Sequence, residues 1–416
     1  MVIVFATSSF HGGGITSYGL EFIKHYSVNN DVRVLIGDDS LCPIDNKRII
    51  VYKVEGNDLS CENAKRTIRL INDEIKPDII INSNSQIVAF VTPFFLQSIR
   101  VITVSHSLKY VEADIAAFNH KYVDSIVALS GYNKEYLDKR FHITNEDKCR
   151  VVYNFVGEGD AVDSVLTEKK SRKVKRIIYM GGSSGAKTPE LVFRILKKLL
   201  KTDLSFEFFW LGADTPPLQK LQPFQSISEL LPKDDRVIFT KKIPRVEAEK
   251  ISSEANIILI PSRREGCPMA LLEAMRYGVI SITSNYDNAC KELIVNGYNG
   301  FIRSRKNVDE FVEVLKEILA NPTNYDHLYD NSLETYRSKL SYYSWKNKMD
   351  DLIYQAPIMH KQRIASFKKS YYLFSVLKFK LLNLSNYIDK SINETLASAI
   401  PFFFFYLTNK CSRWKN

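Results

Sequence analysis

The chain has 416 residues, 45% of them hydrophobic and 25% charged, which excludes a disordered polypeptide and favours more than one folded domain. Its formal net charge of +10 is concentrated from Pro357 onward, where ten Lys and Arg residues are opposed only by Asp389 and Glu394. The rest of the chain is therefore close to neutral, which argues against a nucleic-acid-binding core and indicates a basic appendage.

The six cysteines are scattered without C-x-x-C spacing. Neither a zinc site nor a disulfide framework follows from them, and a reducing compartment fits best. The first residues, MVIVFATSS, lack the basic segment of a signal peptide and already look like a strand. No apolar run reaches the ~18 residues of a membrane-spanning helix. We therefore expect a cytoplasmic protein.

Short apolar runs alternate with helical patterns from the first residue onward. Runs that are apolar on both faces and separated by helices are typical of a parallel sheet covered on both sides. The predicted strands of this part are Val2–Ala6, Val32–Ile36, Ile79–Asn82, Val101–Val104, Ser125–Leu129 and Arg150–Tyr153, and two of the predicted helices are Ser60–Ile75 and Gly131–Phe141.

The charged stretch Glu168–Arg176, EKKSRKVKR, interrupts this alternation and is interpreted as a solvated linker between domains. The alternation then restarts, which predicts a second doubly wound domain. Its predicted strands are Ile177–Met180, Phe206–Leu211, Val237–Thr240, Ile257–Ile260 and Val279–Thr283, and its helices are Pro189–Leu200, Val246–Ala255 and Pro268–Tyr277.

The predicted fold class is α/β, with two doubly wound, Rossmann-like domains facing a cleft and a helical, basic and aromatic tail. The domains are expected at residues 1–170 and 171–340, followed by a helix at 341–356 that returns to the first domain and a tail at 357–416. Ligands of such sheets bind beyond the carboxyl ends of the strands, so the loops that follow strands are the places to look for chemistry.

The first such loop, SSFHGGGITSY, carries three glycines, of which Gly13 and Gly14 directly precede a predicted helix. A backbone without side chains can approach phosphate oxygens closely, and the helix N-terminus favours negative charge. The triplet does not match G-x-G-x-x-G, so a plain tight turn is an equally good interpretation.

The second loop, MGGSSGAKTPELVF, opens at Gly181 and Gly182 and places Lys187 just before a helix that starts at Pro189. A lysine at a helix N-terminus is disfavoured by the helix dipole unless an anion is nearby. Lys187 is therefore a candidate phosphate ligand, with a solvated surface lysine as the alternative.

The third loop, PSRREGCPMALLEAM, follows the strand Ile257–Ile260 and carries Glu265 in the loop and Glu273 in the next helix. Helical spacing directs the apolar residues Leu271, Leu272 and Met275 to the sheet and Glu273 to another face. Spacing alone leaves two interpretations open: acids stabilised by the helix dipole and a pair with Arg276, or two carboxylates that hold one ligand.

This third loop resembles the E-x7-E motif of the retaining glycosyltransferase family 4, which has the GT-B fold. Other segments resemble the same family in the same order along most of the chain from Met1 to about Gln355, and the tail lies outside the resemblance. These segments are DSIVALSGYNKEYL, RVVYNFVG, FFWLGAD, ANIILIPSRREG and KELIVNGYNGFI.

The resemblance implies roles for individual residues. Glu265 would contact the donor sugar near the reacting carbon, and Glu273 would bind the ribose. His106, at the end of a strand in VITVSHSLKY, would lie beside the sugar, although a lone histidine is more often packed or solvated. The other implied donor-binding residues are Gly13, Gly14, Gly181, Lys187, Gly266, Cys267, Pro268 and Met269, and the implied catalytic residues are Glu265, His106 and Lys187.

One position departs from the family pattern. Gly182 stands where the family usually has an arginine that helps the lysine bind the diphosphate. Arg263 and Arg264 are candidates for the missing charge.

The implied reaction transfers a sugar from a nucleotide-sugar, with a UDP-sugar preferred, to a hydroxyl with retention of configuration. In the family's front-face description the leaving phosphate helps to deprotonate the acceptor. Fixed positive and dipolar groups would stabilise that leaving group. No D-x-D motif occurs in the chain, so no metal cofactor is predicted.

Three alternatives share some of these features. Two carboxylates could serve a glycoside hydrolase, but a hydrolase has no need of phosphate-type loops. A GT-B epimerase or phosphorylase would share the fold. A non-catalytic subunit that binds a nucleotide-sugar without transferring it is favoured only by Gly182.

The tail mixes lysines with aromatic and aliphatic residues, as in KKSYYLFSVLKFKLLNLSNYI and PFFFFYL. This pattern suits contact with an anionic membrane surface, or packing of the aromatics back on the first domain. With membrane contact the location would be peripheral, on the inner face of the cell membrane. The acceptor would then be a glycan or lipid-linked intermediate of surface polysaccharide biosynthesis, and no nucleic acid partner is expected.

Overall fold

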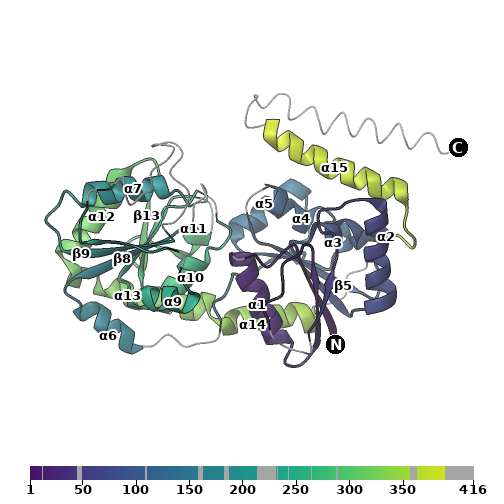
Figure 1. Cartoon of the computed structure of the whole chain (residues 1–416), viewed down its shortest axis with the longest axis horizontal. Helices are drawn as coiled ribbons and strands as arrows, with labels where there is room; N and C mark the ends of the chain where they lie inside the picture. The colour runs from purple at the N-terminus through teal and green to yellow at the C-terminus, as the bar shows by residue number, and fades with distance from the viewer. Residues whose placement is uncertain are drawn as a thin grey trace.

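A computed structural model describes residues 1–388 except residues 12, 45–48, 108–109, 158–162, 182–186, 213–230, 232, 242, 264, 287–288 and 357–362. It contains a seven-stranded sheet in the order β3-β2-β1-β4-β5-β6-β7 and a six-stranded sheet in the order β10-β9-β8-β11-β12-β13. All of the named strand pairs are parallel. Figure 1 shows the two sheets side by side, each with helices packed around it. The prediction of two doubly wound domains is confirmed.

The first domain is held together by strands whose apolar side chains are buried on both faces. Ile3, Val4 and Phe5 of β1 are all 0% exposed, because helices cover both sides of the sheet. Its strands are β1 (Val2–Thr7), β2 (Asp31–Ile36), β3 (Ile50–Lys53), β4 (Ile79–Ser83), β5 (Arg100–Ser105), β6 (Ser125–Ala128) and β7 (Cys149–Val151), and its helices are α1 (Gly14–Tyr26), α2 (Cys61–Arg69), α3 (Gln86–Val91), α4 (Tyr110–Ala117) and α5 (Gly131–Phe141).

The second domain repeats this arrangement around its own core, which includes Trp210, Phe311 and Leu315. Its strands are β8 (Lys175–Met180), β9 (Phe206–Leu211), β10 (Val237–Phe239), β11 (Ile257–Ile260), β12 (Ile280–Ser284) and β13 (Gly300–Arg303). Its helices are α6 (Asp163–Ser171), α7 (Pro189–Leu199), α9 (Arg245–Glu254), α10 (Met269–Arg276), α11 (Ala289–Leu293), α12 (Val308–Ala320) and α13 (Asp326–Thr335).

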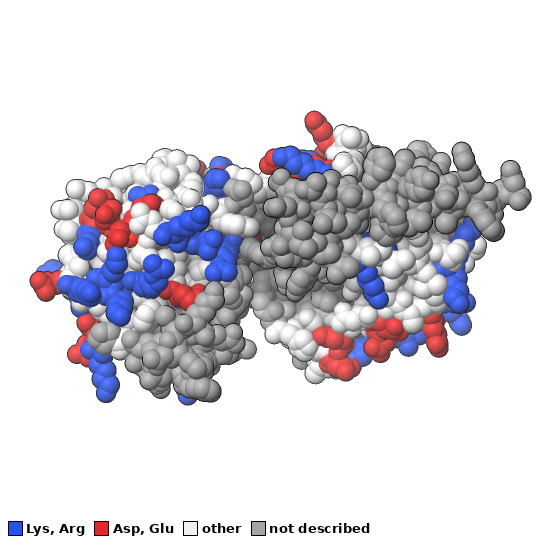
Figure 2. Space-filling model, turned by 90° about the horizontal axis from the view of Figure 1, so that it is seen from above, with Lys and Arg blue, Asp and Glu red and all other residues white. Residues whose placement is uncertain are grey.

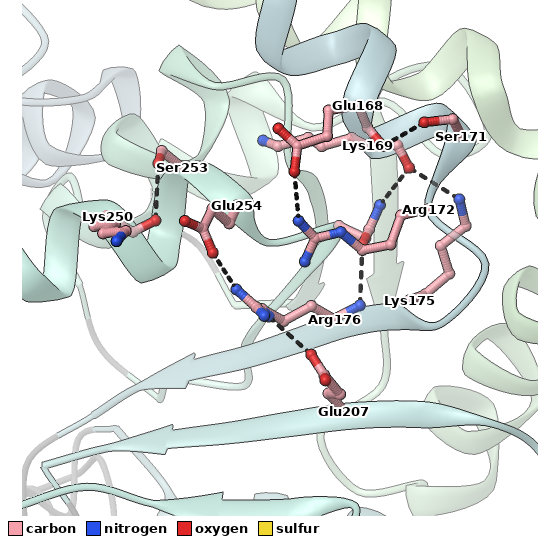
Figure 3. Close-up of polar contacts among 11 residues, drawn as sticks. Glu168, Lys169, Ser171, Arg172, Lys175, Arg176, Glu207, Lys250, Ser253 and Glu254 are labelled. Carbon is pink, nitrogen blue, oxygen red and sulfur yellow. Dashed lines mark hydrogen bonds and ion pairs between the residues drawn. The ribbon is translucent and has the colours of Figure 1, made fainter.

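The interpretation of Glu168–Arg176 as a solvated linker is wrong. Helix α6 runs to Ser171 and β8 begins at Lys175, so only three residues separate them. Lys169 and Lys175 are 1% and 2% exposed, and the Lys175 ammonium donates to the carbonyls of Lys169 and Lys170 at 3.0 and 3.1 Å. Arg176 forms ion pairs with Glu207 and Glu254 (Figure 3). Charge alone did not reveal these partners: Glu207 and Glu254 come from β9 and α9, far from Arg176 in the sequence.

After α13 the chain returns to the first domain through α14 (Tyr342–Asp350), which lies beneath α1 in the view of Figure 1. Trp345 stacks on Phe155 with ring centroids 3.8 Å apart. Arg100 donates to three carbonyls of the following turn, those of Leu352, Ile353 and Ala356, at 2.8 to 2.9 Å. Aromatic packing and these hydrogen bonds hold the end of the second half against the first domain.

Helix α15 (Lys369–Ile388) packs on α2, α3 and α4 of the first domain (Figure 1). Tyr372, Val376 and Phe379 on its inner face are 0%, 8% and 3% exposed and belong to that domain's core. The predicted packing of tail aromatics on the first domain is therefore observed for this helix, whereas PFFFFYL lies outside the described residues. Within the part of the chain described, no helix combines the length and hydropathy needed to cross a bilayer.

The charge of the second domain is visible on one side of the molecule. Figure 2 shows Lys and Arg side chains gathered over this domain, with acidic residues beside them. Helix α7 exposes Arg194, Lys197 and Lys198, and Lys198 forms an ion pair with Asp309 of α12 at 2.5 Å. This basic face is thus partly neutralised by its neighbour.

Candidate functional site

His106 directly follows β5, at the edge of the first sheet that meets the second domain. Its Nε2 lies 2.7 Å from the Ser83 hydroxyl at the end of β4. Its ring stands edge-on to Tyr18 of α1, with centroids 4.9 Å apart. Burial lowers the pKa of His106 to about 3, so the imidazole is neutral at physiological pH. A neutral, oriented imidazole can exchange a hydrogen bond with a sugar hydroxyl but adds no positive charge for a phosphate.

This low pKa predicts a pH-dependent contribution of His106 to stability. The unfolded chain binds a proton at His106 below its ordinary pKa of 6.5, and the folded chain binds one only near 3. Stability should therefore fall as the pH drops through this window, by up to ~1.4 kcal/mol per pH unit. His106→Gln should flatten this slope in urea unfolding between about pH 7 and about pH 4.5. An unchanged slope would show that His106 titrates alike in both states.

Glu265 and Lys187 form an ion pair at the carboxyl edge of the second sheet. Glu265 lies in the loop after β11, and Lys187 precedes α7. The Glu265 carboxylate also accepts a hydrogen bond from the Ser262 hydroxyl at 3.0 Å. The side chain of Glu265 is 14% exposed and that of Lys187 29% exposed, so the pair is partly desolvated yet reachable from solvent. The structure thus brings together two residues that lie 78 positions apart in the sequence.

The loop of Glu265 meets His106 of the other domain. A Cβ atom added to Gly266 would lie 2.5 Å from the His106 carbonyl oxygen. The resemblance implies that Gly266 binds the donor, but in the structure the first domain takes up the space that a side chain at Gly266 would fill. A second glycine contact lies nearby, because a Cβ on Gly14 would lie 3.6 Å from Met269 Cγ. The glycine loop and the E-x7-E loop therefore face each other across the domain junction.

Helix α10 carries the rest of this motif. Leu271, Leu272 and Met275 are 0% exposed, which confirms the predicted face toward the sheet, and Glu273 lies on a partly exposed face. Arg276 forms an ion pair with Glu249 at 3.5 Å. Burial raises the pKa of the Cys267 thiol to about 12, so Cys267 offers its backbone rather than a thiolate. Pro268 precedes the first helical residue, Met269.

Thr188, the residue after Lys187, has a strained backbone conformation. Thr188 adopts φ 48°, a left-handed conformation that is uncommon outside glycine, and its hydroxyl donates to the Pro261 carbonyl. The Tyr179 hydroxyl donates to the Lys187 carbonyl at 3.2 Å. The first contact ties the segment of Lys187 to the loop of Glu265, and the second ties it to β8. Gly181 is buried at the end of β8, whereas Gly182 and Arg264 lie outside the described residues.

Sequence reasoning missed several polar residues at this junction. The Asn154 side chain donates to the Cys267 carbonyl at 2.9 Å. Asn133 donates to the Ser105 hydroxyl and the Ser107 carbonyl, on either side of His106. Asn154 and Asn133 fall within RVVYNFVG and GYNKEYL, two segments that resemble the family. Membership in those segments was the sequence signal that could have identified them. No sequence signal pointed to Ser83, because only the parallel pairing of β4 and β5 places it beside His106.

Part of the chain is similar to known glycosyltransferase sequences. Residues 166–335 match the family described as Glycosyl transferases group 1. An uncharacterised glycosyltransferase of Haemophilus influenzae is 29% identical over 173 residues, 41% of this chain and 47% of that protein. The lipopolysaccharide 1,6-galactosyltransferase of Salmonella typhimurium is 25% identical over 229 residues, 54% of this chain and 61% of that protein. The chain thus spans about half the length of these curated relatives.

Solved structures extend the likeness to both domains. The structure of HepE from Anabaena in complex with UDP has a TM-score of 0.68 and 14% sequence identity, and the match covers 85% of this chain and 99% of that one. At this identity the likeness shows the fold alone. Residues 166–335 therefore match the group 1 glycosyl transferases, and the likeness to solved structures shows the GT-B fold for both domains.

Proposed function

We propose that this protein transfers a sugar from a nucleotide-sugar, by preference a UDP-sugar, to a hydroxyl of a glycan or lipid-linked acceptor in surface polysaccharide biosynthesis. The observation that carries the proposal is the Glu265–Lys187 pair beside the contact of Gly266 with His106. HepE, which shares the fold, has been solved with UDP and with UDP-glucose. The matched Salmonella protein is a lipopolysaccharide galactosyltransferase, which supports the acceptor class.

In the proposed reaction the donor diphosphate replaces Glu265 as the partner of Lys187. The bond from the anomeric carbon to the diphosphate oxygen breaks, and a bond from that carbon to the acceptor oxygen forms on the same face. The acceptor proton passes to the departing diphosphate. Lys187, the backbone at Gly13 and Gly14 and the N-terminus of α7 stabilise the charge that develops. Glu265, released from the ion pair, stabilises the positive character of the sugar, and Glu273 binds the ribose. The proposal assigns no role to a metal ion.

The experiment that tests this function presents the purified protein with radiolabelled UDP-sugars and a mixture of membrane-derived acceptors. Label transferred to an acceptor is the expected result. Release of free sugar alone would instead indicate hydrolysis. Tight UDP binding, measured as a rise in Tm with ligand concentration, without transfer of label to any acceptor would favour the non-catalytic alternative.

We further propose that α15 brings the enzyme to an anionic membrane surface. Opposite its buried face, Leu373, Phe374 and Leu377 are 46%, 42% and 52% exposed. Lysines 369, 378 and 380 are also exposed, and residues 369–388 contain no Asp or Glu. An apolar stripe bordered by lysines suits the plane of a lipid headgroup layer.

Substituting Leu373, Phe374 and Leu377 by glutamine should abolish cosedimentation with vesicles that contain anionic lipid. Lys378→Gln with Lys380→Gln should weaken binding by ~10-fold or more, since each lysine near such a surface contributes about 1 kcal/mol, and salt should weaken it further. These changes leave Tyr372, Val376 and Phe379 in the core, so the fold should persist, whereas a deletion from Phe367 would expose that core. Undiminished vesicle binding by the triple variant would refute the proposal.

A further inference from the structure

The carboxylate of Glu292, on α11 of the second domain, makes three hydrogen bonds to the first domain. It accepts from the backbone N–H groups of Gly131 and Tyr132 at 2.9 and 2.7 Å and from the Tyr153 hydroxyl at 2.8 Å. Gly131 and Tyr132 are the first two residues of α5, whose N–H groups have no acceptor within the helix. A carboxylate at this position also interacts favourably with the helix dipole.

Both ends of this contact lead to the candidate site. In the second domain, the Ala289 N–H at the start of α11 donates to the Gly266 carbonyl at 3.2 Å. In the first domain, Asn133 in the first turn of α5 donates to Ser105 and Ser107 at 3.1 and 3.2 Å. Those two residues flank His106, whose carbonyl lies against Gly266. The contacts therefore form a closed ring from the loop of Glu265, through Glu292 and α5, to His106.

We propose that Glu292 is a positioning residue for sugar transfer. It docks the second domain on the N-terminus of α5 and thereby sets the separation between the loop of Glu265 and His106. This inference rests on the proposed transfer function, and it gives Glu292 no contact with substrate. The contacts assigned to the donor lie mainly on the second domain, so loss of the docking contact should impair the transfer step more than donor binding.

The test is Glu292→Gln, which keeps the size of the side chain and removes its charge. An amide accepts at its oxygen only, so one of the two N–H contacts is lost. The amide protons of Gly131 and Tyr132 should exchange with solvent at least ~10-fold faster in the ligand-free chain, as expected for loss of a charged hydrogen bond. The kcat should fall by ~10- to 100-fold, because small displacements of reacting groups have effects of this size, while the donor KM changes by less than ~3-fold.

Two further variants sharpen the experiment. Tyr153→Phe removes one donor to the same carboxylate and should have a smaller effect of the same kind. Glu313→Gln, on the exposed face of α12, is the matched control and should change neither exchange nor kcat. Thermal unfolding confirms that each variant is folded.

Unchanged exchange at Gly131 and Tyr132 in the folded Glu292→Gln variant overturns the inference. So does faster exchange with wild-type kcat, since the contact would then not position the reaction. A wild-type protein that transfers no sugar overturns the proposed function alone, because the exchange measurement needs no donor and still decides whether Glu292 docks the domains.

Discussion

Replacing Glu265 by glutamine is expected to lower the kcat of sugar transfer by ~10²- to 10³-fold, the usual cost of losing one preorganised electrostatic contact in a transition state. The same change frees Lys187, which is the ion-pair partner of Glu265 in the ligand-free protein. Lys187 would then meet the donor diphosphate without competition, so the donor KM should stay constant or decrease. Steady-state kinetics with a single UDP-sugar at saturating acceptor separates the two effects.

Glu273→Gln is the natural comparison for this variant, because it changes the other carboxylate of the same motif. If Glu273 binds the ribose, its loss should raise the donor KM and leave kcat much less affected. A Glu265→Gln variant with wild-type kcat would show that this carboxylate does not act on the reacting carbon. Equal effects of both variants on KM alone would assign Glu265 to binding.

Gly266→Ala is expected to lower transfer by ~10²-fold, although it adds only one methyl group. That methyl would lie 2.5 Å from the His106 carbonyl oxygen, a backbone atom that cannot turn aside, so the two domains must separate or shift. Nucleotide binding should persist, because the contacts assigned to the nucleotide lie mainly on the second domain. Isothermal titration with UDP, together with the transfer rate, measures both properties.

The same substitution should also loosen the contact of Glu292 with α5, since both contacts belong to one ring around the junction. Faster amide exchange at Gly131 in Gly266→Ala would link the two observations. Equal transfer rates in Gly266→Ala and wild type would mean that the domains need not approach this closely during the reaction, and the importance of the contact would then be disproved.

Much of the fold could be predicted because its strands are buried on both faces. Runs such as residues 79–81 and Ile257–Ile260 are apolar at every position, and a sheet covered on both sides buries all of these side chains. The strands that escaped prediction lie at the sheet edges. β13 begins with a glycine and has only two apolar residues, so it lacks the continuous apolar pattern of a central strand. β3 lies in the apolar run of residues 49–52, which the prediction overlooked, and it is largely exposed at the sheet edge.

The burial of charged residues was also not predicted from the sequence. Lys169 and Lys175 belong to a run of charges that is typical of a solvated segment. Their ammonium groups are nevertheless buried, because the backbone carbonyls of Lys169, Lys170 and Tyr277 accept hydrogen bonds from them. Hydrogen bonds of this kind depend on which backbone carbonyls the fold brings close to the lysine, and a local sequence pattern does not predict them.

By itself, the sequence determined the two α/β halves, the loops expected to carry chemistry and the resemblance that singled out Glu265 and Lys187, because burial and loop position leave periodic and local signals. Only the tertiary structure decided that these two residues pair, that Gly266 lies against His106 and that Glu292 reaches α5. Each of these contacts joins residues from distant parts of the chain, the first within the second domain and the other two across the domain junction. Their distances depend on how separately patterned segments pack together, and the periodicity of the sequence does not encode that packing.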